Sequence, residues 1–434
     1  MSSEAVIESL DQEGRGVARV AGKVAFIEDA LTGEAVVYSA YRKNTNCEFG
    51  KAERILRSSP MRVAPRCRYF GICGGCSMQH LDAIAQVAAK QRILEDNLRH
   101  IGNVKAEMLL PPIYGREWEY RQRARLSVRY VSKKGGVLMG FHERRSSFVA
   151  DTQSCEILPR RISELINPLR DLIGSLSLRE RIPQLELSIG EAADVLVLRV
   201  LGEPNNNDKE LLKAFADRHR LQFYLQPGGP ESAYALYPEN MPRLYYTIPE
   251  FNLTLEFHPT EYTQVNHAMN RMLVRRAMQL LEPARGERIA DLFCGLGNFT
   301  LPAARCGAKV TGIEGVVELA RRAEENAVRN GLKDLTDFRV ANLFEATEAS
   351  LAGFGRFDKM LLDPPRDGAV AVVKSLGDSA PPRIVYISCN PATLARDAAV
   401  LVHTKGYGLK AAGVINMFPH TSHVESIVLF EKAK

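Results

Sequence analysis

The stretch that decides the fold runs from Glu287 to Leu332, ERIADLFCGLGNFTLPAARCGAKVTGIEGVVELARRAEENAVRNGL. It predicts, in order, a strand, a glycine loop, a helix, a second strand that ends in an acidic residue, and a second helix. This order is typical of half of a doubly wound α/β sheet. We therefore expect a C-terminal Rossmann-like domain over residues 261–434.

The glycine loop of this stretch indicates a nucleoside ligand. Gly295 and Gly297 would let the backbone approach a ligand closely, and Glu314 ends the next strand, where an acid can hydrogen-bond ribose hydroxyls. Dinucleotide sites favour G-x-G-x-x-G, whereas this loop continues Gly-Leu-Gly-Asn-Phe-Thr. Because S-adenosylmethionine has no pyrophosphate to hold, the shorter loop favours this methyl donor over NAD.

Two later strands end in residues that could carry chemistry. In FDKMLLDPPRDG the strand ends at Asp363, and the two prolines that follow hold the chain extended, so that this side chain points into the cleft. Arg366 stands where amine-methylating enzymes have an aromatic residue, which argues against that chemistry. In RIVYISCNPATLARD, Cys389 follows a strand, although a cysteine in such a place is more often a packed core residue than a nucleophile.

A thiol in this crevice suits methylation of a pyrimidine carbon. Carbon 5 of uracil is a poor nucleophile until a group adds to carbon 6, and a base must later remove the proton from carbon 5. Cys389 is the candidate nucleophile, and Glu425, at the start of the last predicted strand, is the candidate base. His420 and His423 are rival bases. Cys294, in the glycine loop, is the rival nucleophile, which we expect to pack against the donor site instead.

Four of the eight cysteines form a pattern. PRCRYFGICGGCSMQH places Cys67, Cys73 and Cys76 in a C-x5-C-x2-C arrangement, and DTQSCEILPR adds Cys155. In a chain without a signal-peptide pattern, this number of cysteines argues for metal binding or chemistry rather than disulfides. Four thiolates suit zinc and an iron–sulfur cluster equally, and the spacing does not choose between them.

The first half of the chain contains candidate RNA-binding surfaces. Residues 1–57 alternate short apolar strands with glycine-containing turns, which predicts a small β-barrel. The net charge is only +6, but nine Lys or Arg against three acids lie between positions 116 and 145. Such a stretch suits phosphates and unpaired bases, and a solvated sheet face explains it equally well. The arginines that share one strand face and the aromatic residues near them are Arg123, Arg125, Arg129, Trp118, Tyr120 and Phe141.

Two further features complete the outline of the chain. Residues 81–99 have apolar residues near helical spacing and predict an amphipathic helix. No apolar run approaches the roughly 18 residues that a membrane span needs. We therefore expect a cytoplasmic protein without a membrane partner.

DPPRDG, IVYISCNPAT and HVESIVLF, taken together, resemble the RNA uracil-5-methyltransferase family, whose signature joins an Asp-Pro-Pro-Arg-x-Gly turn to a Ser-Cys-Asn strand. The resemblance implies that Cys389 is the nucleophile and Glu425 the general base. Phe293 stands where many methyltransferases have a third glycine, a departure that is usual within this family. The resemblance also implies six positions that hold S-adenosylmethionine: Gln264, Phe293, Asn298, Glu314, Asn342 and Asp363.

The N-terminal half is similar to one type within this family, which methylates one uridine of bacterial 23S ribosomal RNA. That type joins a TRAM barrel, which is OB-like, to four cysteines that hold a [4Fe-4S] cluster. The resemblance therefore implies a cluster rather than zinc at Cys67, Cys73, Cys76 and Cys155. The members that modify transfer RNA resemble this chain in its second half but lack the cysteine loop. One ribosomal branch has the cysteines without the barrel.

These features predict a monomeric multidomain protein of three domains. They are a TRAM-like RNA-binding barrel over 1–57, an α+β iron–sulfur domain with the basic RNA-contact strand over 58–260, and an S-adenosylmethionine-dependent methyltransferase domain over 261–434. The expected reaction is methylation of carbon 5 of a uridine in 23S ribosomal RNA. The alternatives are the same chemistry on transfer RNA or at a second 23S site, and a non-catalytic RNA-binding assembly factor built on a methyltransferase scaffold.

Overall fold

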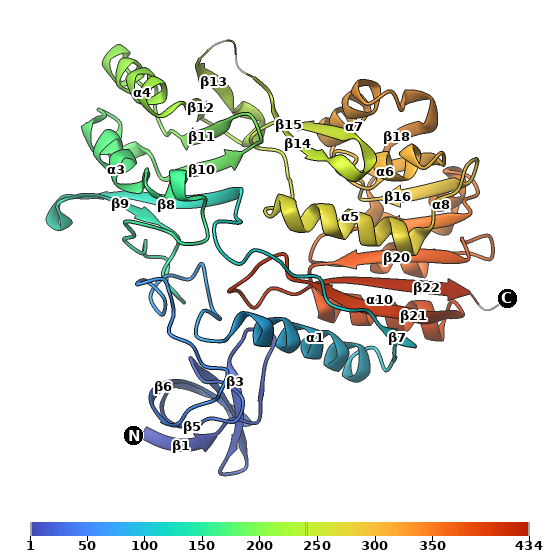
Figure 1. The fold of residues 1–434 in the computed structure, drawn as a ribbon, viewed down its shortest axis with the longest axis horizontal. Coiled ribbons are helices and arrows are strands. Elements are labelled where there is room, and N and C mark those ends of the chain that lie inside the picture. Colours follow the sequence, from blue (N-terminus) through green and yellow to red (C-terminus); the bar gives the residue numbers. More distant parts are fainter. Residues whose placement is uncertain (1, 239, 241, 433–434) are drawn as a thin grey trace.

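The computed structural model describes residues 2–238, 240 and 242–432. In Figure 1 the N-terminal and central sheets lie on one side of the molecule and the eight-stranded C-terminal sheet lies on the other. No helix among the described residues is long and apolar enough to cross a membrane.

The N-terminal sheet has six strands in the order β1-β5-β6-β4-β3-β2. It curls until β1 contacts β3, and its inner face encloses a small core that includes Ile7, Ile27 and Tyr38. The predicted strands are confirmed. Among the described residues, β1 and β2 are the two edge strands of this sheet and are not paired with each other. The strands are β1 (Ser2–Val6), β2 (Ser9–Leu10), β3 (Gly16–Val20), β4 (Lys23–Glu28), β5 (Ala35–Lys43) and β6 (Cys47–Arg57).

The central sheet also has six strands, in the order β13-β12-β11-β10-β8-β9, and three helices flank it. In β8 the residues alternate between buried and exposed, so Ala124, Leu126 and Val128 face a separate hydrophobic core. The elements are β8 (Arg123–Val131), β9 (Gly136–Gly140), α2 (Arg160–Ser163), α3 (Ile166–Ser175), β10 (Gln184–Ile189), β11 (Asp194–Arg199), α4 (Asn206–His219), β12 (Gln222–Gln226) and β13 (Tyr234–Tyr237). A hairpin of β14 (Leu244–Ile248) and β15 (Leu253–Phe257) follows.

The C-terminal sheet has the order β18-β17-β16-β19-β20-β22-β21-β7. Its first five strands in this order are parallel to one another. The next strand, β22, is antiparallel to both of its neighbours, β20 and β21, and β7 pairs in parallel with β21 at the edge. The strands are β7 (Met108–Leu109), β16 (Arg288–Leu292), β17 (Lys309–Glu314), β18 (Thr336–Val340), β19 (Lys359–Leu362), β20 (Arg383–Ser388), β21 (Tyr407–Ile415) and β22 (Glu425–Lys432). The Rossmann-like sheet predicted from the glycine loop is confirmed.

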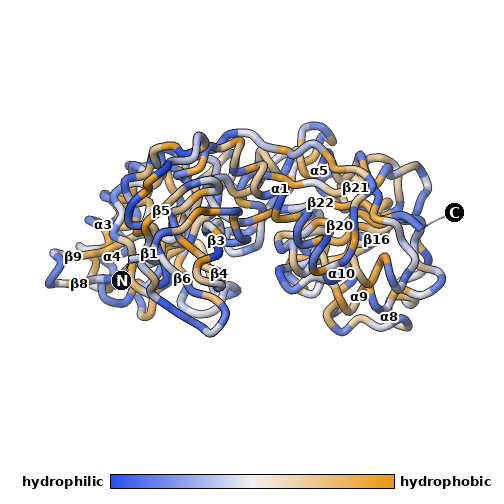
Figure 2. The backbone as a smooth tube through the Cα atoms, turned by 90° about the horizontal axis from the view of Figure 1, so that it is seen from below, coloured by the Kyte–Doolittle hydropathy of each residue, from blue (hydrophilic) through white to orange (hydrophobic). Residues whose placement is uncertain are grey.

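Helices cover both faces of this sheet, so its strands are hydrophobic on both sides. Along β20, Val385 and Ile387 face the core under α5, while Ile384 and Tyr386 face the core under α1 and α10. Figure 2 shows hydrophobic segments gathered at β16, β20 and β22. The helices are α1 (Ala83–His100), α5 (His267–Leu281), α6 (Thr300–Arg305), α7 (Val317–Arg329), α8 (Glu348–Gly353), α9 (Val370–Lys374) and α10 (Pro391–His403).

Part of the chain before residue 261 packs with the C-terminal sheet. The predicted helix over residues 81–99 is α1, which lies against α10 and β21, and β7 pairs in parallel with the edge strand β21. The buried side of α1 includes the polar residues Gln86 and Lys90, which hydrophobic spacing could not indicate. The domain boundaries at 57/58 and 260/261 stay a prediction. The core of the C-terminal sheet includes residues from before position 260 as well as residues after it.

Candidate active site

The predicted catalytic and donor-binding residues lie at one end of the C-terminal sheet. The parallel strands β18, β17, β16, β19 and β20 all point their carboxyl ends the same way, which is where open α/β sheets bind ligands. Because β22 is antiparallel to β20, it begins at that same end. In strand order from β18 to β22, the residues at or next to this end are Asn342, Glu314, Phe293, Asp363, Cys389 and Glu425.

Cys389 and Glu425 are brought together by strand register. Ser388 at the end of β20 is paired with Ser426 near the start of β22, so the next residues outward, Cys389 and Glu425, stand opposite each other. Burial, and then the charges of Glu425 and Asp363, raise the pKa of the Cys389 thiol to about 12, against the opposing effect of Arg366. Glu425 is only 3 % exposed.

The carboxyl groups of this site favour their protonated forms. Burial and then the charge of Asp363 raise the pKa of Glu425 well above its usual range. Burial, with a contribution from Asp291, raises the pKa of Asp363 to about 8. These shifts follow from desolvation next to like charges, and groups perturbed in this way are typical of functional sites.

Hydrogen bonds join the DPPRDG loop to the loop that carries the thiol. The backbone oxygen of Arg366 accepts from the Asn390 amide and the Thr393 hydroxyl, both at 3.1 Å. Asp397, buried in α10, accepts from the backbone N–H of Ala369 at 2.7 Å. A Cβ at Gly368, whose φ is +77°, would lie 2.7 Å from the Asp397 carboxylate, so only glycine fits this approach. The two loops therefore hold Asp363 and Cys389 in a fixed relation.

The glycine loop is ordered by Glu314. The Glu314 carboxylate accepts from the backbone N–H groups of Gly295 at 2.9 Å and of Val316 at 3.0 Å. Phe293 has a φ of +64°, a left-handed conformation that is uncommon outside glycine. This explains why many methyltransferases have glycine at this position, and the Phe293 ring lies 5.7 Å from that of Phe344.

The other two predicted donor residues come from different parts of the fold. Asn298 exchanges amide hydrogen bonds with Asn270 of α5 at 2.8 and 2.9 Å and also accepts from the Tyr246 hydroxyl. Gln264 is buried in the segment between β15 and α5. Asn298 in this structure therefore fixes α5 to the glycine loop.

Tyr262 is a site residue that the sequence did not reveal. Desolvation by surrounding protein atoms raises the pKa of its phenol, and the charges of Glu425, Asp363 and Cys389 raise it further, which places the hydroxyl among these groups. The residue as a whole is 63 % exposed, so its ring stands in an open crevice and not in the core. The available signal was its position two residues before Gln264 in EYTQVNHAMN.

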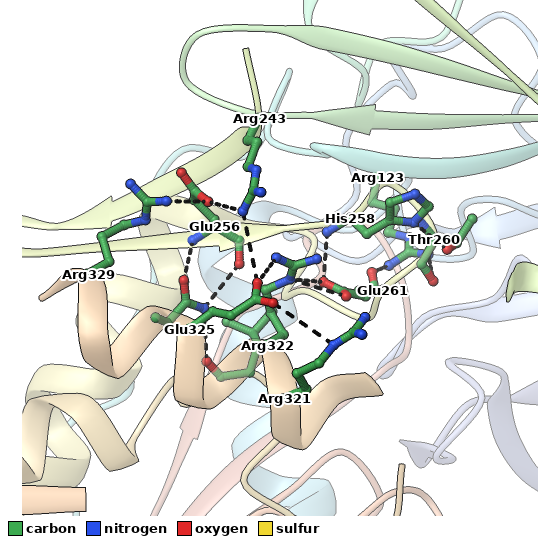
Figure 3. Close-up of polar contacts among 12 residues, drawn as sticks. Arg123, Arg243, Glu256, His258, Thr260, Glu261, Arg321, Arg322, Glu325 and Arg329 are labelled. Carbon is green, nitrogen blue, oxygen red and sulfur yellow. Dashed lines mark hydrogen bonds and ion pairs between the residues drawn. The ribbon is translucent and has the colours of Figure 1, made fainter. Parts of the chain in front are cut away.

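Arg123, on β8 of the central sheet, binds the segment that leads into Tyr262 and Gln264. Its guanidinium donates to Glu186 at 2.6 Å. It also donates to the backbone oxygens of Thr260, at 3.0 Å, and of Glu261 (Figure 3). The Glu261 carboxylate in turn pairs with Arg322 of α7 at 3.2 Å. Through Thr260 and Glu261, which directly precede Tyr262 in the sequence, this network connects the central sheet to α7.

This arrangement corrects part of the expected basic stripe. Arg125 and Arg129 are exposed as predicted, but Arg123 is committed to the carboxylate of Glu186 and to backbone oxygens. Of the neighbouring aromatic residues, Tyr120 is buried and donates to the backbone oxygen of Pro419, and the Phe141 ring lies 5.6 Å below Arg121. The Tyr120 ring is therefore not accessible to a base.

The rival residues have other surroundings. His420 stacks on Trp118 at 3.8 Å and its backbone N–H bonds Gln86, so it is a packing residue. His423 lies 3.0 Å from the Arg366 guanidinium, and burial together with Arg366 lowers its pKa to about 4. Cys294 is buried, and a Cβ at Gly312 would lie 2.9 Å from its sulfur. The expectation that this thiol packs beneath the glycine loop is confirmed.

The four patterned cysteines line one pocket beside the central sheet. Gly75 donates its backbone N–H to the Cys73 sulfur at 3.4 Å, and the Cys67 backbone N–H donates to Gln79. Burial, with contributions from the charges of the neighbouring thiols, raises the pKa of Cys76 and of Cys155 to about 12. Among the described residues, no three His, Cys, Asp or Glu side chains form a group that could hold a single metal ion. The donor chemistry of four partly buried thiols that line one pocket fits a cationic cluster, which would offset thiolate charge.

Comparisons with known proteins agree on the family. The sequence pattern described as tRNA (Uracil-5-)-methyltransferase matches residues 83–433. The 23S rRNA (uracil(1939)-C(5))-methyltransferase RlmD of Nitrosospira multiformis is 64% identical over 436 aligned residues, which cover 100% of this chain and 99% of the relative. The RlmD of Thiobacillus denitrificans is 60% identical over 98% of this chain and 99% of its own, and that of Aromatoleum aromaticum is 59% identical over 99% of both.

A solved structure shares the fold over its full length. The crystal structure of Pyrococcus abyssi tRNA (uracil-54, C5)-methyltransferase in complex with S-adenosyl-L-homocysteine matches with a TM-score of 0.74 and 23% identity, covering 98% of this chain and 99% of the other. The likeness concerns the fold alone.

The thiol environment generates a test of the site. The Glu425→Gln variant removes a carboxyl group whose negative charge, when ionised, raises the pKa of Cys389. The rate of Cys389 alkylation by iodoacetamide, followed from pH 7 to pH 10, is therefore expected to rise at lower pH in the variant, with a difference of about 3- to 10-fold at the pH where Glu425 is ionised. In both proteins the rate should rise with pH, because only the thiolate reacts. Peptide mass spectrometry measures each cysteine separately. Cys306, which is exposed and has no acid near it that shifts its pKa, is the internal control. An unchanged or slower rate at Cys389 would contradict the proposed proximity.

Proposed function

The chain belongs to the tRNA (uracil-5-)-methyltransferase family, and from this we propose that it methylates carbon 5 of a uridine in 23S ribosomal RNA with S-adenosylmethionine as donor. The observation that carries the proposal is the 64% identity over the whole chain to an enzyme named for uracil 1939 of 23S rRNA. We therefore propose the equivalent uridine as the target. The cytoplasmic location and monomeric state expected from the sequence are part of this proposal.

The catalytic roles follow from the order of residues at the sheet edge. The Cys389 sulfur adds to carbon 6 of the uracil, which turns carbon 5 into an enolate-like nucleophile. Bound S-adenosylmethionine supplies the methyl sulfonium that carbon 5 attacks. Glu425, opposite Cys389 in register, takes the proton from carbon 5, and the carbon–sulfur bond then breaks to release the thiolate and the methylated base.

The remaining residues position the reactants. Asp363 lies between the thiol strand and the glycine-loop strand, so it can contact both the base and the donor. Glu314, Asn298 and Gln264 are proposed to hold the donor, with Phe293 and Asn342 at the same edge of the sheet. The uridine must leave its base stack to reach this crevice, because carbons 5 and 6 have to lie between Cys389, Glu425 and the donor.

The raised pKa values have a role in this mechanism. A carboxyl group that is protonated in the empty site can hydrogen-bond uracil oxygens, and arrival of a cationic donor favours the ionised forms of Glu425 and Cys389. Arg366 acts in the same direction, because its charge lowers the pKa of the thiol. When the donor is bound, its positive charge and that of Arg366 thus both favour the thiolate form of Cys389.

We also propose that Cys67, Cys73, Cys76 and Cys155 hold a [4Fe-4S] cluster. The supporting observation is that these four partly buried thiols line one pocket and that Gly71, Gly74 and Gly75 flank the first three of them. Methyl transfer through an enolate requires no electron, so the cluster has a structural or RNA-positioning role. The C-x3-C-x2-C pattern expected for radical chemistry is absent from the sequence. The N-terminal sheet is proposed to be the TRAM-type, OB-like module of this arrangement.

Transfer RNA is the second candidate substrate. The observation that favours it is the whole-chain fold shared with a transfer-RNA methyltransferase. Against it stands the much higher identity to enzymes named for 23S rRNA. An assembly factor without catalysis would not require the Cys389, Glu425 and Asp363 arrangement.

The experiment that tests the function measures transfer of labelled methyl from S-adenosylmethionine into purified unmodified 23S RNA, 16S RNA and transfer RNA. We expect label in 23S RNA alone, and loss of at least about a thousandfold in the Cys389→Ala variant, because the thiol is required for the activated intermediate. Cys306→Ser, which changes an exposed thiol, is the matched control. Label in transfer RNA would favour the second candidate, and no label in any RNA would contradict the proposed function.

The cluster is tested on protein purified without oxygen. We expect about four iron and four sulfide per chain, with loss of most of both in Cys155→Ser and no change in Cys306→Ser. Zinc at about one per chain, without sulfide, would contradict the cluster proposal and leave the methylation proposal in place.

A further inference from the structure

The segment between β21 and β22, residues 416–424, leads directly into Glu425 and is held by parts of the chain far away in sequence. The backbone N–H groups of Ser77 and Met78 both donate to the backbone oxygen of His420 at 2.9 Å. His420 has a φ of +65°, a left-handed conformation that is strained in a residue with a side chain. Such a conformation persists only where the surrounding contacts maintain it, so the segment depends on its partners.

Helix α1 provides two buried polar side chains that bind this segment. The Gln86 side-chain oxygen accepts from the backbone N–H of His420 at 2.8 Å, and its nitrogen lies 3.2 Å from His420 Nδ1. Lys90, four residues further along α1, donates from Nζ to Asn416 Oδ1 at 2.7 Å. The same Nζ donates to the backbone oxygen of Phe418 at 2.8 Å. One ammonium group therefore fixes two positions of the segment at once.

The burial of Lys90 is unfavourable in itself. Only 1 % of the residue is exposed, and among the described residues its nitrogen pairs with the neutral oxygens of Asn416 and Phe418 and with no carboxylate. Burial lowers the pKa of the ammonium group to about 7, because desolvation disfavours the charged form. An apolar side chain of similar length would fill this space without that penalty. The contacts of the ammonium group, and not packing, therefore account for a lysine at this position.

We propose that Lys90 is a positioning residue for Glu425. By fixing the segment that enters β22, it sets where the Glu425 carboxyl group stands relative to carbon 5 of the uracil. In the step concerned, the bond from carbon 5 to hydrogen breaks and the proton passes to Glu425. The electron pair forms the double bond between carbons 5 and 6, and the bond from carbon 6 to the Cys389 sulfur breaks. The inference rests on the proposed function, in which Glu425 is the base.

The Lys90→Met variant of the full chain keeps the length of the side chain and removes the ammonium group. We expect kcat for methylation of a 23S RNA fragment to fall about 10- to 100-fold, because the base is displaced from its proton. The ratio kcat/KM should change by less than about threefold, because it depends only on steps up to the irreversible methyl transfer. A methylated protein–RNA adduct at Cys389 should accumulate, which denaturing gels and intact mass measure. Lys105→Met, at an exposed lysine after α1, is the matched control.

Two variants of Asn416 test the same contact from its other side, even where Lys90→Met does not fold. Asn416→Leu removes an oxygen that accepts from Lys90, so it should lower kcat and accumulate the adduct as Lys90→Met does. Asn416→Asp keeps an oxygen for the ammonium group, and its kcat should exceed that of Asn416→Leu by at least about fivefold. The double variant Lys90→Met with Asn416→Leu should be slower than either single variant by less than about threefold, because both remove one contact.

Hydrogen exchange of residues 416–424 tests the anchoring independently of activity, and it should be at least about 10-fold faster in Lys90→Met than in the unchanged protein. Equal falls in kcat and kcat/KM without an adduct would overturn the proposal, since they indicate a loss of folded enzyme. Normal kinetics in Lys90→Met and Asn416→Leu would overturn it as well. If the unchanged protein methylates no RNA, the proposed function fails, and the exchange rates alone then decide for or against the anchoring by Lys90.

Discussion

The antiparallel pairing of β22 with β20 is the constraint on which the site depends. In a sheet that stayed parallel to its end, the first residue of this strand would lie at the opposite edge from Cys389. Because β22 reverses, Glu425 begins where β20 ends, and the register of Ser388 with Ser426 sets the two side chains opposite each other. Asp363 enters the same place from β19, the other neighbour of β20. One strand reversal therefore brings together the thiol and the carboxyl group that the chemistry requires.

This arrangement places groups that can carry negative charge close together and away from water, which makes their ionised forms unfavourable. Burial raises the pKa values of Cys389, Glu425 and Asp363. Negative charge nearby raises them further: that of Glu425 and Asp363 acts on Cys389, that of Asp363 on Glu425, and that of Asp291 on Asp363. The loops around them are correspondingly rigid, with Asn390 and Thr393 bonded to the Arg366 backbone and Asp397 bonded to Ala369. Such a site favours a cationic ligand, which agrees with a sulfonium donor.

The sequence predicted the features that short segments encode. The glycine loop, Glu314, the Asp-Pro-Pro-Arg turn and the Cys389 strand each follow from local patterns, and the structure brings these elements to one edge of one sheet. Features that depend on distant partners were missed. Tyr262 has no local motif, and Arg123 looks like part of a basic face until Glu186 and the Thr260 backbone are brought against it. The packing of α1 and β7 with the C-terminal sheet depends on contacts with residues about 300 positions away.

The central claim is that Cys389 forms a covalent bond with the uracil and that Glu425 is required to end it. The most direct measurement is the intact mass of the Glu425→Gln variant after incubation with S-adenosylmethionine and an unmodified 23S RNA fragment. We expect a stable protein–RNA adduct that carries one added methyl group, mapped by peptide analysis to Cys389, because addition and methyl transfer precede removal of the proton. Normal turnover of this variant without an adduct would contradict the role of Glu425, and an adduct at another residue would contradict the role of Cys389.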